Sequence, residues 1–432
     1  MAGPERTARM LGGLLEAAHL AGIEELPGLI AEYAALAGLE DVRLYVVDLR
    51  QELLRELTGR GPDAGDGGDE HSVDGTLAGA AFRETRTIAS SHLTDGGRRR
   101  YWAPVLDGTQ RLGVLRADCV DDEDGEDGRA ALRPLSSLAG LLLASKRPFS
   151  DSHARLVRTE TMHVAAEMQW KLMPPPAFAN DQVVIAAAME PAYEVAGDAF
   201  DYALAGDIVH LAIFDAMGHD SAAGLTANLA VATCRSKRRD GADLVATAQA
   251  IERALVKEFV HTRYTTGILA DLDTRTGLLS WVNCGHLPPV LIRGGRWTTT
   301  LNCPPSHPMG TELELPVTVC HEQLEPGDRL LLYTDGITEA RDAGRQEFGL
   351  AQFVEFIVRH HADGLPVPET LRRLMRAVLR HHRDSLSDDA TVVFLEWHGS
   401  ARNTALRPTR SRGGRLPDEN APTGAQIPET PT

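Results

Sequence analysis

The stretch "DAFDYALAGDIVHLAIFDA", residues 198–216, decides the fold because it predicts a tight antiparallel hairpin. Two strand-like runs, 199–205 and 208–214, flank Gly206 and Asp207, a favourable two-residue hairpin turn. With those two residues as the loop, residues equidistant from the turn face each other across the pair. The register therefore places Asp198 opposite Asp215 at the open end of the hairpin.

Two carboxylates that face each other across an antiparallel pair destabilise it unless something neutralises them. A divalent cation is the simplest candidate, since Mg²⁺ and Mn²⁺ favour carboxylate, carbonyl and water oxygens. For this pair alone an alternative stays open. A different turn would break the register, and one aspartate would then be a turn or helix-capping residue that faces solvent.

Two later segments repeat the pattern of a strand end, an aspartate and a small or turn residue. "GDRLLLYTDGITEA" (327–340) is an apolar strand that ends in Asp335 and Gly336, and "SDDATVVFLEW" (387–397) has Asp388 and Asp389 at its start. Four carboxylate-bearing strand ends without a matching Lys/Arg cluster suit a site for two metal ions better than a set of salt bridges.

The surrounding sequence predicts antiparallel sheets packed face to face with helices outside. Amphipathic helices are expected at 243–260, 350–361 and 368–385, and strands at 265–273, 278–286 and 289–295. The "TRTG" turn between the first two of these strands makes them a second hairpin.

The whole chain has 432 residues, which favours two domains, and its 43% hydrophobic and 24% charged residues are typical of a globular protein. The formal charge of −17 disfavours nucleic-acid binding, and no apolar run is long enough to span a membrane. The N-terminus lacks a signal pattern, so we expect a cytoplasmic protein. Five scattered cysteines predict reduced structural thiols and neither a disulfide framework nor a zinc site: Cys119, Cys234, Cys284, Cys303 and Cys320.

Residues 1–150 combine a helical start, strand-like runs and a closing helix at 131–146, a pattern that resembles a GAF sensor domain. A PAS domain or a ligand-free module are the alternatives. Within this region we expect a mobile loop at 59–72 and an acidic loop at 121–129. A connector, 151–176, is predicted to be one helix to Met173, ended by three prolines. The tail, 399–432, lacks apolar periodicity and is predicted to be disordered.

Five ordered motifs carry a family resemblance: "YEVAGDAFD", "FDAMGHDSAAGL", "YTTGILADLDTRTGLLSWVNCGHLPPVLIRGG", "LLLYTDGITEA" and "SDDATVVF". In that order they resemble the bacterial sporulation-stage-II-E and stress-response branch of the protein phosphatase 2C superfamily. The resemblance implies that residues 177–398 form a metal-dependent protein serine/threonine phosphatase domain. The whole chain is then an α+β protein, a GAF-like domain followed by an α-β-β-α sandwich of two antiparallel sheets flanked by helices.

The resemblance also implies a ligand set for two Mn²⁺ or Mg²⁺ ions. Asp215 would bridge them, with the Ala216 carbonyl on one ion and Asp198 in its shell directly or through water. Asp335 and Asp388 would hold the other. Because a metal-activated water attacks the phosphate, no protein nucleophile is required.

Neighbouring residues receive lesser roles. The proton-donating histidine of eukaryotic relatives corresponds to Met217 here, so His219 is interpreted as a structural loop residue. His286 is expected to form a turn with a satisfied ring, Asp389 to be a supporting or surface residue, and the pairs 360/361 and 381/382 to have no chemical role. Asp220, where relatives often have glycine, adds a carboxylate that puts substrate preference in doubt.

The resemblance favours a phosphatase acting on a phosphorylated regulatory protein of the anti-sigma-factor-antagonist class. Two other classes stay open: a phosphoprotein-binding regulator without turnover, and a small-molecule phosphohydrolase. A small-molecule ligand for the GAF-like region and a homodimer are both compatible with the sequence.

Overall fold

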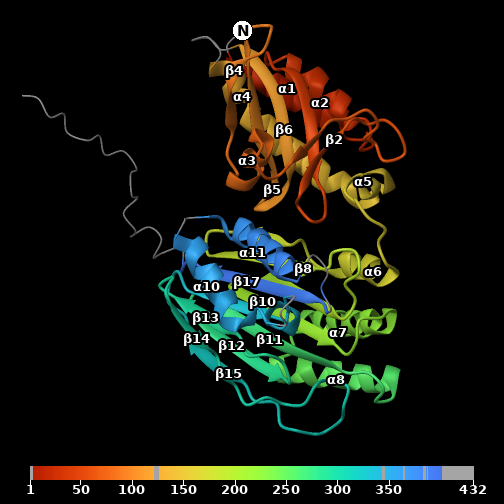
Figure 1. Ribbon diagram of the computed structural model, residues 1–432, viewed down its shortest axis with the longest axis vertical. Coiled ribbons are helices and arrows are strands. Elements are labelled where there is room, and N and C mark those ends of the chain that lie inside the picture. Colours follow the sequence, from red (N-terminus) through yellow and green to blue (C-terminus); the bar gives the residue numbers. More distant parts are fainter. Residues whose placement is uncertain are drawn as a thin grey trace, which may run out of the picture.

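The computed structural model describes residues 3–120, 126–342, 346–362, 365–382, 386 and 388–400. They form two units stacked along the long axis of the molecule (Figure 1). The predicted disordered tail, 399–432, lies outside the described residues beyond Ser400, and so does the first part of the acidic loop, 121–125. None of the described helices combines the length and the apolar run that a bilayer crossing needs.

The first unit is built on one antiparallel six-stranded sheet with the order β3-β2-β1-β6-β5-β4. Its strands are β1 (Glu40–Val47), β2 (Leu53–Leu57), β3 (Glu70–Ser72), β4 (Ile88–Leu93), β5 (Arg98–Asp107) and β6 (Gln110–Val120). The segment 59–72, predicted to be a mobile loop, instead contains β3 and backbone hydrogen bonds from Thr58 and Gly59 to the Ala64 carbonyl. The many glycines and aspartates of this segment are typical of a loop and gave no sign of this pairing.

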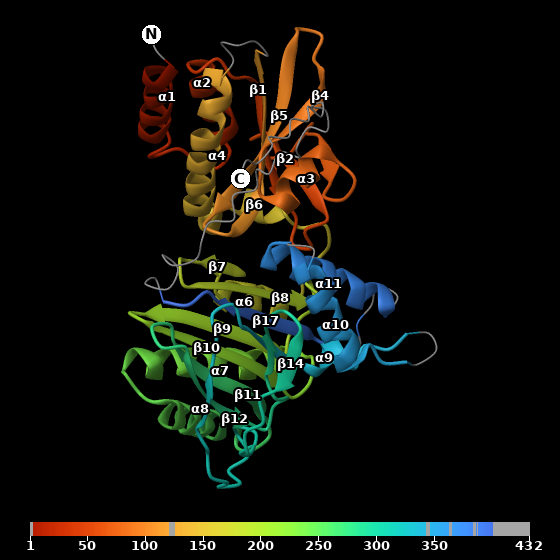
Figure 2. The same cartoon turned by 90° about the vertical axis from the view of Figure 1, so that its left-hand side faces the viewer.

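Helices cover both faces of this sheet (Figure 2). The helices α1 (Gly3–Ala17), α2 (Leu26–Ala35) and α4 (Glu126–Lys146) lie on one face, and α3 (Leu77–Glu84) lies on the other. Each face has its own apolar core, one centred on Leu44 and Leu115, the other on Tyr45, Phe82 and Trp102. The order of helix, sheet and closing helix agrees with the predicted one, and the GAF-like assignment stays a prediction.

The connector differs from the single helix that the sequence predicted. It contains α5 (Asp151–Leu156) and α6 (Val164–Leu172), separated by an irregular segment. Tertiary hydrogen bonds hold that segment open: the Thr159 amide donates to the Tyr193 hydroxyl and the His163 amide to the Tyr193 carbonyl, at 3.0 and 2.9 Å. Local helix propensity is overridden by these contacts.

The second unit contains two antiparallel sheets packed against each other, as predicted. One has the order β15-β12-β11-β10-β9 and the other β14-β13-β16-β17-β8-β7. The first comprises β9 (Asp198–Ala205), β10 (Ile208–Ala216), β11 (Thr265–Asp273), β12 (Leu278–Cys284) and β15 (Cys320–Gln323). The second comprises β7 (Ala177–Ala179), β8 (Val183–Glu190), β13 (Val290–Arg293), β14 (Trp297–Thr300), β16 (Arg329–Tyr333) and β17 (Ala390–Trp397).

Helices cover the outer faces of this sandwich. The first sheet carries α7 (Ser221–Arg239) and α8 (Leu244–Phe259). The second carries α10 (Gly349–Ala362) and α11 (Val367–His381), and the short α9 (Asp335–Thr338) follows β16. The main core lies between the sheets and includes Phe200, Phe214, Trp281 and Leu395. The described residues therefore form a mixed α+β protein with an α-β-β-α second unit.

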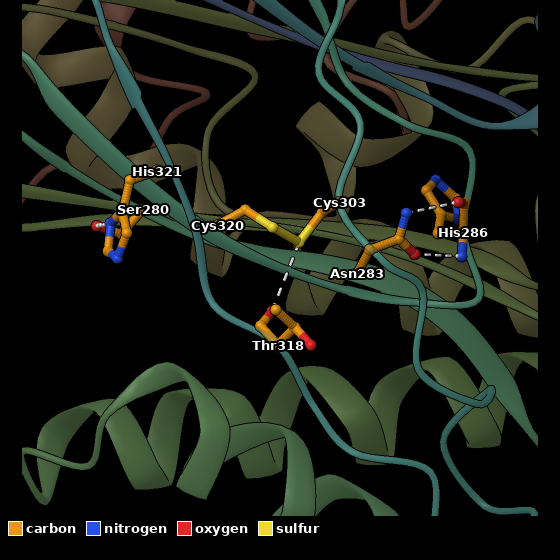
Figure 3. The surroundings of a disulfide bond; sticks show 7 residues. All are labelled: Ser280, Asn283, His286, Cys303, Thr318, Cys320 and His321. Atoms are coloured by element: carbon orange, nitrogen blue, oxygen red, sulfur yellow. Dashed lines mark hydrogen bonds between the residues drawn. A yellow bond between two sulfur atoms is a disulfide. The ribbon is translucent and has the colours of Figure 1, made fainter.

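One cysteine prediction is wrong. Cys303 and Cys320 form a disulfide (Figure 3). Cys119, Cys234 and Cys284 are buried thiols, as predicted. Strand β15 returns beside β12 after the long 301–319 connection, which brings the two Cα atoms to 5.8 Å. Their spacing of 17 residues carries no motif, so only the return of the chain brings them together.

Candidate metal centre

The hairpin that carries the first two aspartates has the predicted register. Asp215 pairs directly with Asp198 across β9 and β10, and Gly206 adopts the positive φ of +60° that the turn requires. On its other side Asp215 pairs with Thr266 of β11. The short-range prediction is therefore confirmed, and both carboxylates belong to the open end of the first sheet.

The other two aspartates belong to the second sheet. Asp335 is the first residue of α9, two residues after β16 ends, and Asp388 lies two residues before β17 begins. Gly336 allows these loops to meet, because a Cβ at this position would lie 2.0 Å from the Asp389 carbonyl oxygen. The glycine that follows Asp335 is thus required by a close backbone approach.

Electrostatic interactions connect the four predicted ligands. Burial raises the pKa of Asp215 to about 7, with the negative charges of Asp335 and Asp388 adding to the effect. Burial also raises the pKa of Asp198, followed by the charges of Asp389 and Asp215. For Asp335, burial raises the pKa first and the charge of Asp388 second. The carboxylates from the two sheets therefore disfavour one another's ionised forms.

Asp389 supports this arrangement from a buried position, which excludes the surface role allowed by the sequence. Its Oδ2 accepts hydrogen bonds from the amides of Ala196, Gly197 and Asp198 at 2.9, 2.7 and 3.3 Å. The Thr334 hydroxyl donates to Asp198 at 2.7 Å. Sequence reasoning missed Thr334, and its position directly before Asp335 was the available signal.

The segment before Asp198 is confined as well. A Cβ on Gly197 would lie 2.7 Å from the Ala216 carbonyl oxygen and 2.5 Å from that of Gly218. Only glycine therefore lets the first motif lie against the end of β10. This contact brings the backbone of the Asp198 motif beside Ala216, the residue whose carbonyl was predicted to contact a metal ion.

His286 confirms the prediction of a turn residue with a satisfied ring. Its amide donates to Asn283 Oδ1 at 2.8 Å, and Asn283 Nδ2 donates to the His286 carbonyl at 3.0 Å (Figure 3). Nδ1 lies 2.7 Å from the Thr266 hydroxyl and Nε2 lies 3.1 Å from the Tyr333 carbonyl, which it must bond as donor. Burial lowers the pKa of His286 to about 4. A neutral ring thus joins the strand beside Asp215 to the strand that precedes Asp335.

The loop between β10 and α7 carries the residues whose roles the sequence left open. His219 and Met217 are exposed. Asp220 caps α7 by accepting from the Ala223 amide at 2.8 Å, and it pairs with Arg263 at 3.0 Å. These bonds lower the pKa of the Asp220 carboxyl, the cap first. Asp220 therefore acts in helix capping and loop anchoring.

A cavity of about 210 Å³ adjoins the carboxylates. It is lined by Asp335, Asp388 and Glu339, together with Arg341 and His382. His382, to which the sequence gave no role, thus lies at the site. The other histidines of the two pairs are engaged elsewhere where described: His360 contacts the Phe356 carbonyl and His381 that of Gln346.

The chemistry of this donor set suits a hard divalent cation, because the carboxylates are acceptors and none of the four forms an ion pair with a described Lys, Arg or His. Among the described residues, however, no three His, Cys, Asp or Glu side chains are already grouped to hold a metal ion. The fit is therefore one of donor type and mutual electrostatics.

Comparison with known proteins supports the family resemblance. Residues 205–398 match the family model described as Stage II sporulation protein E (SpoIIE). The C-terminal half of the chain is a SpoIIE domain. The chain is also similar to the phosphoserine phosphatase RsbP of Bacillus subtilis, 24% identical over 224 residues, which cover 50% of this chain and 53% of RsbP. The chain thus spans about half the length of RsbP.

Two solved structures are similar to the same region. The RsbU and RsbW domains of Rv1364c from Mycobacterium tuberculosis are 23% identical, with a TM-score of 0.44 and coverage of 51% of this chain and 61% of that one. The phosphatase domain of SpoIIE from Bacillus subtilis is 23% identical, with a TM-score of 0.42 and coverage of 51% and 65%. Both similarities cover about half of this chain.

Proposed function

We propose that the SpoIIE domain is a metal-dependent protein serine/threonine phosphatase. The observation that carries this proposal is the set of four aspartates, Asp198, Asp215, Asp335 and Asp388, at the strand ends of two facing sheets. Burial and mutual repulsion raise the pKa of three of them. Binding of divalent cations would offset this repulsion. The similarity to RsbP, a phosphoserine phosphatase, supports the same activity.

The chain's own residues have separable roles under this proposal. Asp198, Asp215, Asp335, Asp388 and the Ala216 carbonyl would hold two divalent cations, Mn²⁺ or Mg²⁺. Such a pair would lower the pKa of a bound water molecule, so that hydroxide, the nucleophile toward phosphorus, is available near neutral pH. Thr334 and Asp389 position the first motif, and the cavity beside Asp335 and Asp388 offers space for the phosphorylated side chain.

The substrate is proposed to be a phosphorylated regulatory protein of the anti-sigma-factor-antagonist class. The similarity to RsbP and to the RsbU and RsbW domains of Rv1364c motivates this class. We would measure phosphate release from a phosphoserine-containing antagonist protein with Mn²⁺, with Mg²⁺ and after chelation. Release that requires metal supports the proposal. Turnover of small phosphate esters alone would favour a small-molecule phosphohydrolase, and binding without turnover would favour a phosphoprotein-binding regulator.

Asp335→Asn tests the metal-ligand role. Turnover should fall by at least a hundredfold and Mn²⁺ affinity should fall, because one anionic ligand is lost while the shape of the side chain is kept. Asp240→Asn is the matched control, since Asp240 is exposed at the end of α7 and, among the described residues, forms an ion pair with Lys237 alone. Retained turnover in Asp335→Asn, with unchanged Mn²⁺ affinity, would contradict the assignment.

The first unit is proposed to regulate this domain through α11. Glu369, fully buried on α11, accepts hydrogen bonds from Arg111 of β6 at 2.7 Å and from Arg372 at 2.9 Å. Arg111 also stacks on the Phe82 ring of α3, 4.6 Å from its centroid. A continuous set of contacts therefore joins the core of the first unit to α11.

The same helix ends at the site. Arg372 and Arg376, on the next turns of α11, pair with Asp74 of the first unit, and His382 directly after the helix lines the cavity beside Asp335. A shift of the first unit against α11 would thus reach the site through one rigid element.

Asp74→Ala in the full chain tests this coupling because it removes the bonds to Arg372 and Arg376 far from the carboxylates. The phosphatase rate should change at least threefold, while Asp95→Ala, an exposed change on the same unit, should leave it as in the wild type. An unchanged rate in a folded Asp74→Ala variant would count against regulation through α11.

A further inference from the structure

A second, larger cavity of about 510 Å³ lies between the two units. Its walls come from both units and from the connector, and α5, α6, β8 and α11 all lie at this boundary (Figure 1). The volume falls within the range of roughly 300–1,000 Å³ that is usual for small-molecule sites. It is separate from the cavity at the metal-site aspartates, with which it shares no lining residue.

The cavity has an extended apolar surface. Leu371, Met375 and Leu379 of α11 face it from the second unit, and Leu112 and Leu143 from the first. Trp170 of α6 also lines it, with its indole nitrogen hydrogen-bonded to the Ala192 carbonyl at 2.7 Å. Leucine, methionine and tryptophan side chains form an adaptable apolar surface, so a ligand for this cavity needs an apolar body.

The acidic groups on the wall are compensated. The Asp48 carboxylate accepts bonds from the amides of Glu52 and Leu53, both at 2.7 Å. Glu52 pairs with Arg376 at 3.6 Å and Glu167 with Arg158 at 2.5 Å. Burial raises the pKa of Glu190 to about 7, so this carboxyl is partly protonated near neutral pH. The wall therefore presents little free negative charge.

Two cations on the wall, the part-buried Arg147 and the exposed Lys171, lack a direct ion pair with any described residue. Within the described part of the chain, Arg147 and Lys171 have no carboxylate within 4 Å, and the Arg147 guanidinium bonds only the neutral Gln110 side chain, at 2.8 Å. Burial lowers the pKa of Arg147, and the charge of Asp107, which acts in the opposite direction, does not offset this effect. The pKa of neighbouring His153 is lowered to about 4 by burial and by the charge of Arg147. A part-buried guanidinium without a carboxylate in direct contact is costly, so this end of the cavity favours an anion. This bias stands out in a chain of net charge −17.

We propose that the cavity between the units binds an organic anion with an apolar body, with its anionic group beside Arg147 and its apolar part against α11 and Trp170. Because the ligand would contact α11 and the first unit together, it would stabilise their present arrangement. The binding site is independent of the proposed phosphatase activity and can be tested without it.

Calorimetric titration of the full chain with sodium decanoate is the direct test, with 1-decanol and inorganic phosphate as probes of the apolar body and the anion alone. We expect saturable decanoate binding, with at least tenfold weaker binding of either control. Arg147→Gln should weaken decanoate binding roughly tenfold, the effect of one charged hydrogen bond. Arg155→Gln, an exposed change on α5 outside the cavity, should bind decanoate as the wild type does.

Tryptophan fluorescence places the binding event. Decanoate should change the emission of the wild type, and Trp170→Phe should remove most of that change while keeping the calorimetric affinity within threefold. Absence of saturable decanoate binding would overturn the proposal. Equal binding of 1-decanol, or an unchanged affinity in a folded Arg147→Gln variant, would overturn it as well.

Discussion

Glu190 provides a quantitative test of the packing between β8 and the connector. It is the last residue of β8, it is 7% exposed, and its carboxylate accepts a hydrogen bond from the Ala192 amide at 2.8 Å. Burial raises its pKa from 4.5 to about 7. Replacement by Gln keeps the acceptor oxygen and removes the titration.

Proton linkage gives the direction in which Glu190 changes the stability with pH. Between pH 4.5 and 7 the folded state holds the Glu190 proton more firmly than the unfolded state, so this group lowers the stability as the pH rises through that window. A shift of 2.5 units corresponds to about 3 kcal/mol at 1.36 kcal/mol per unit. Glu190→Gln should therefore be more stable than the wild type by about 1 kcal/mol at pH 5 and about 3 kcal/mol at pH 8.

Urea denaturation of both proteins, followed by circular dichroism at pH 5 and pH 8, measures these differences. Glu194→Gln is the control, because Glu194 is exposed four residues away and its replacement should change the stability by less than about 0.5 kcal/mol at either pH. The reasoning is refuted if Glu190→Gln gains no stability at pH 8, or if its gain does not grow between the two pH values.

Three further substitutions test the supports of the site and of the interface. Asp389→Asn should lower the phosphatase rate at least tenfold and weaken Mn²⁺ binding with the fold retained, because the charged acceptor for the Asp198 segment is lost; unchanged kinetics would contradict this role. The free energy of unfolding of the wild type should fall by about 2 kcal/mol from pH 7 to pH 5 through His286, because its folded pKa of about 4 lies below its ordinary value and the unfolded state gains the proton first. Paired urea denaturation curves of His286→Gln should lack this decrease. Glu369→Gln should destabilise the chain by about 3–5 kcal/mol in urea, because Arg111 is left buried without its counter-ion; a change below 1 kcal/mol would show that the pair is not essential.

Features that depend on residues close together in the chain were predictable from the sequence. The hairpin of residues 198–216 was predictable in register because a two-residue turn fixes which residues face each other. Asp335 and Asp388 were predictable as strand-end carboxylates because each lies beside an apolar strand-like run. The His286 turn follows from the Asn283 side chain three residues earlier, which bonds the His286 backbone at both ends.

Other features lay beyond the reach of the sequence. The connector breaks after Leu156 because Tyr193, more than thirty residues away, bonds the irregular segment that follows. Cys303 meets Cys320 only when β15 returns beside β12. Asp389 is buried because three amides of the opposite sheet's motif point to its carboxylate.

The sequence by itself determined the hairpin register and the aspartates at the strand ends, because short-range sterics and hydrogen bonding fix these within a few residues. Only the tertiary structure decided how the two sheets bring these aspartates together, how Glu369 meets Arg111 across 258 residues, and that a cavity lies between the units. Such contacts depend on the packing of whole elements, and the local pattern of a chain does not encode which distant surfaces will bury one another.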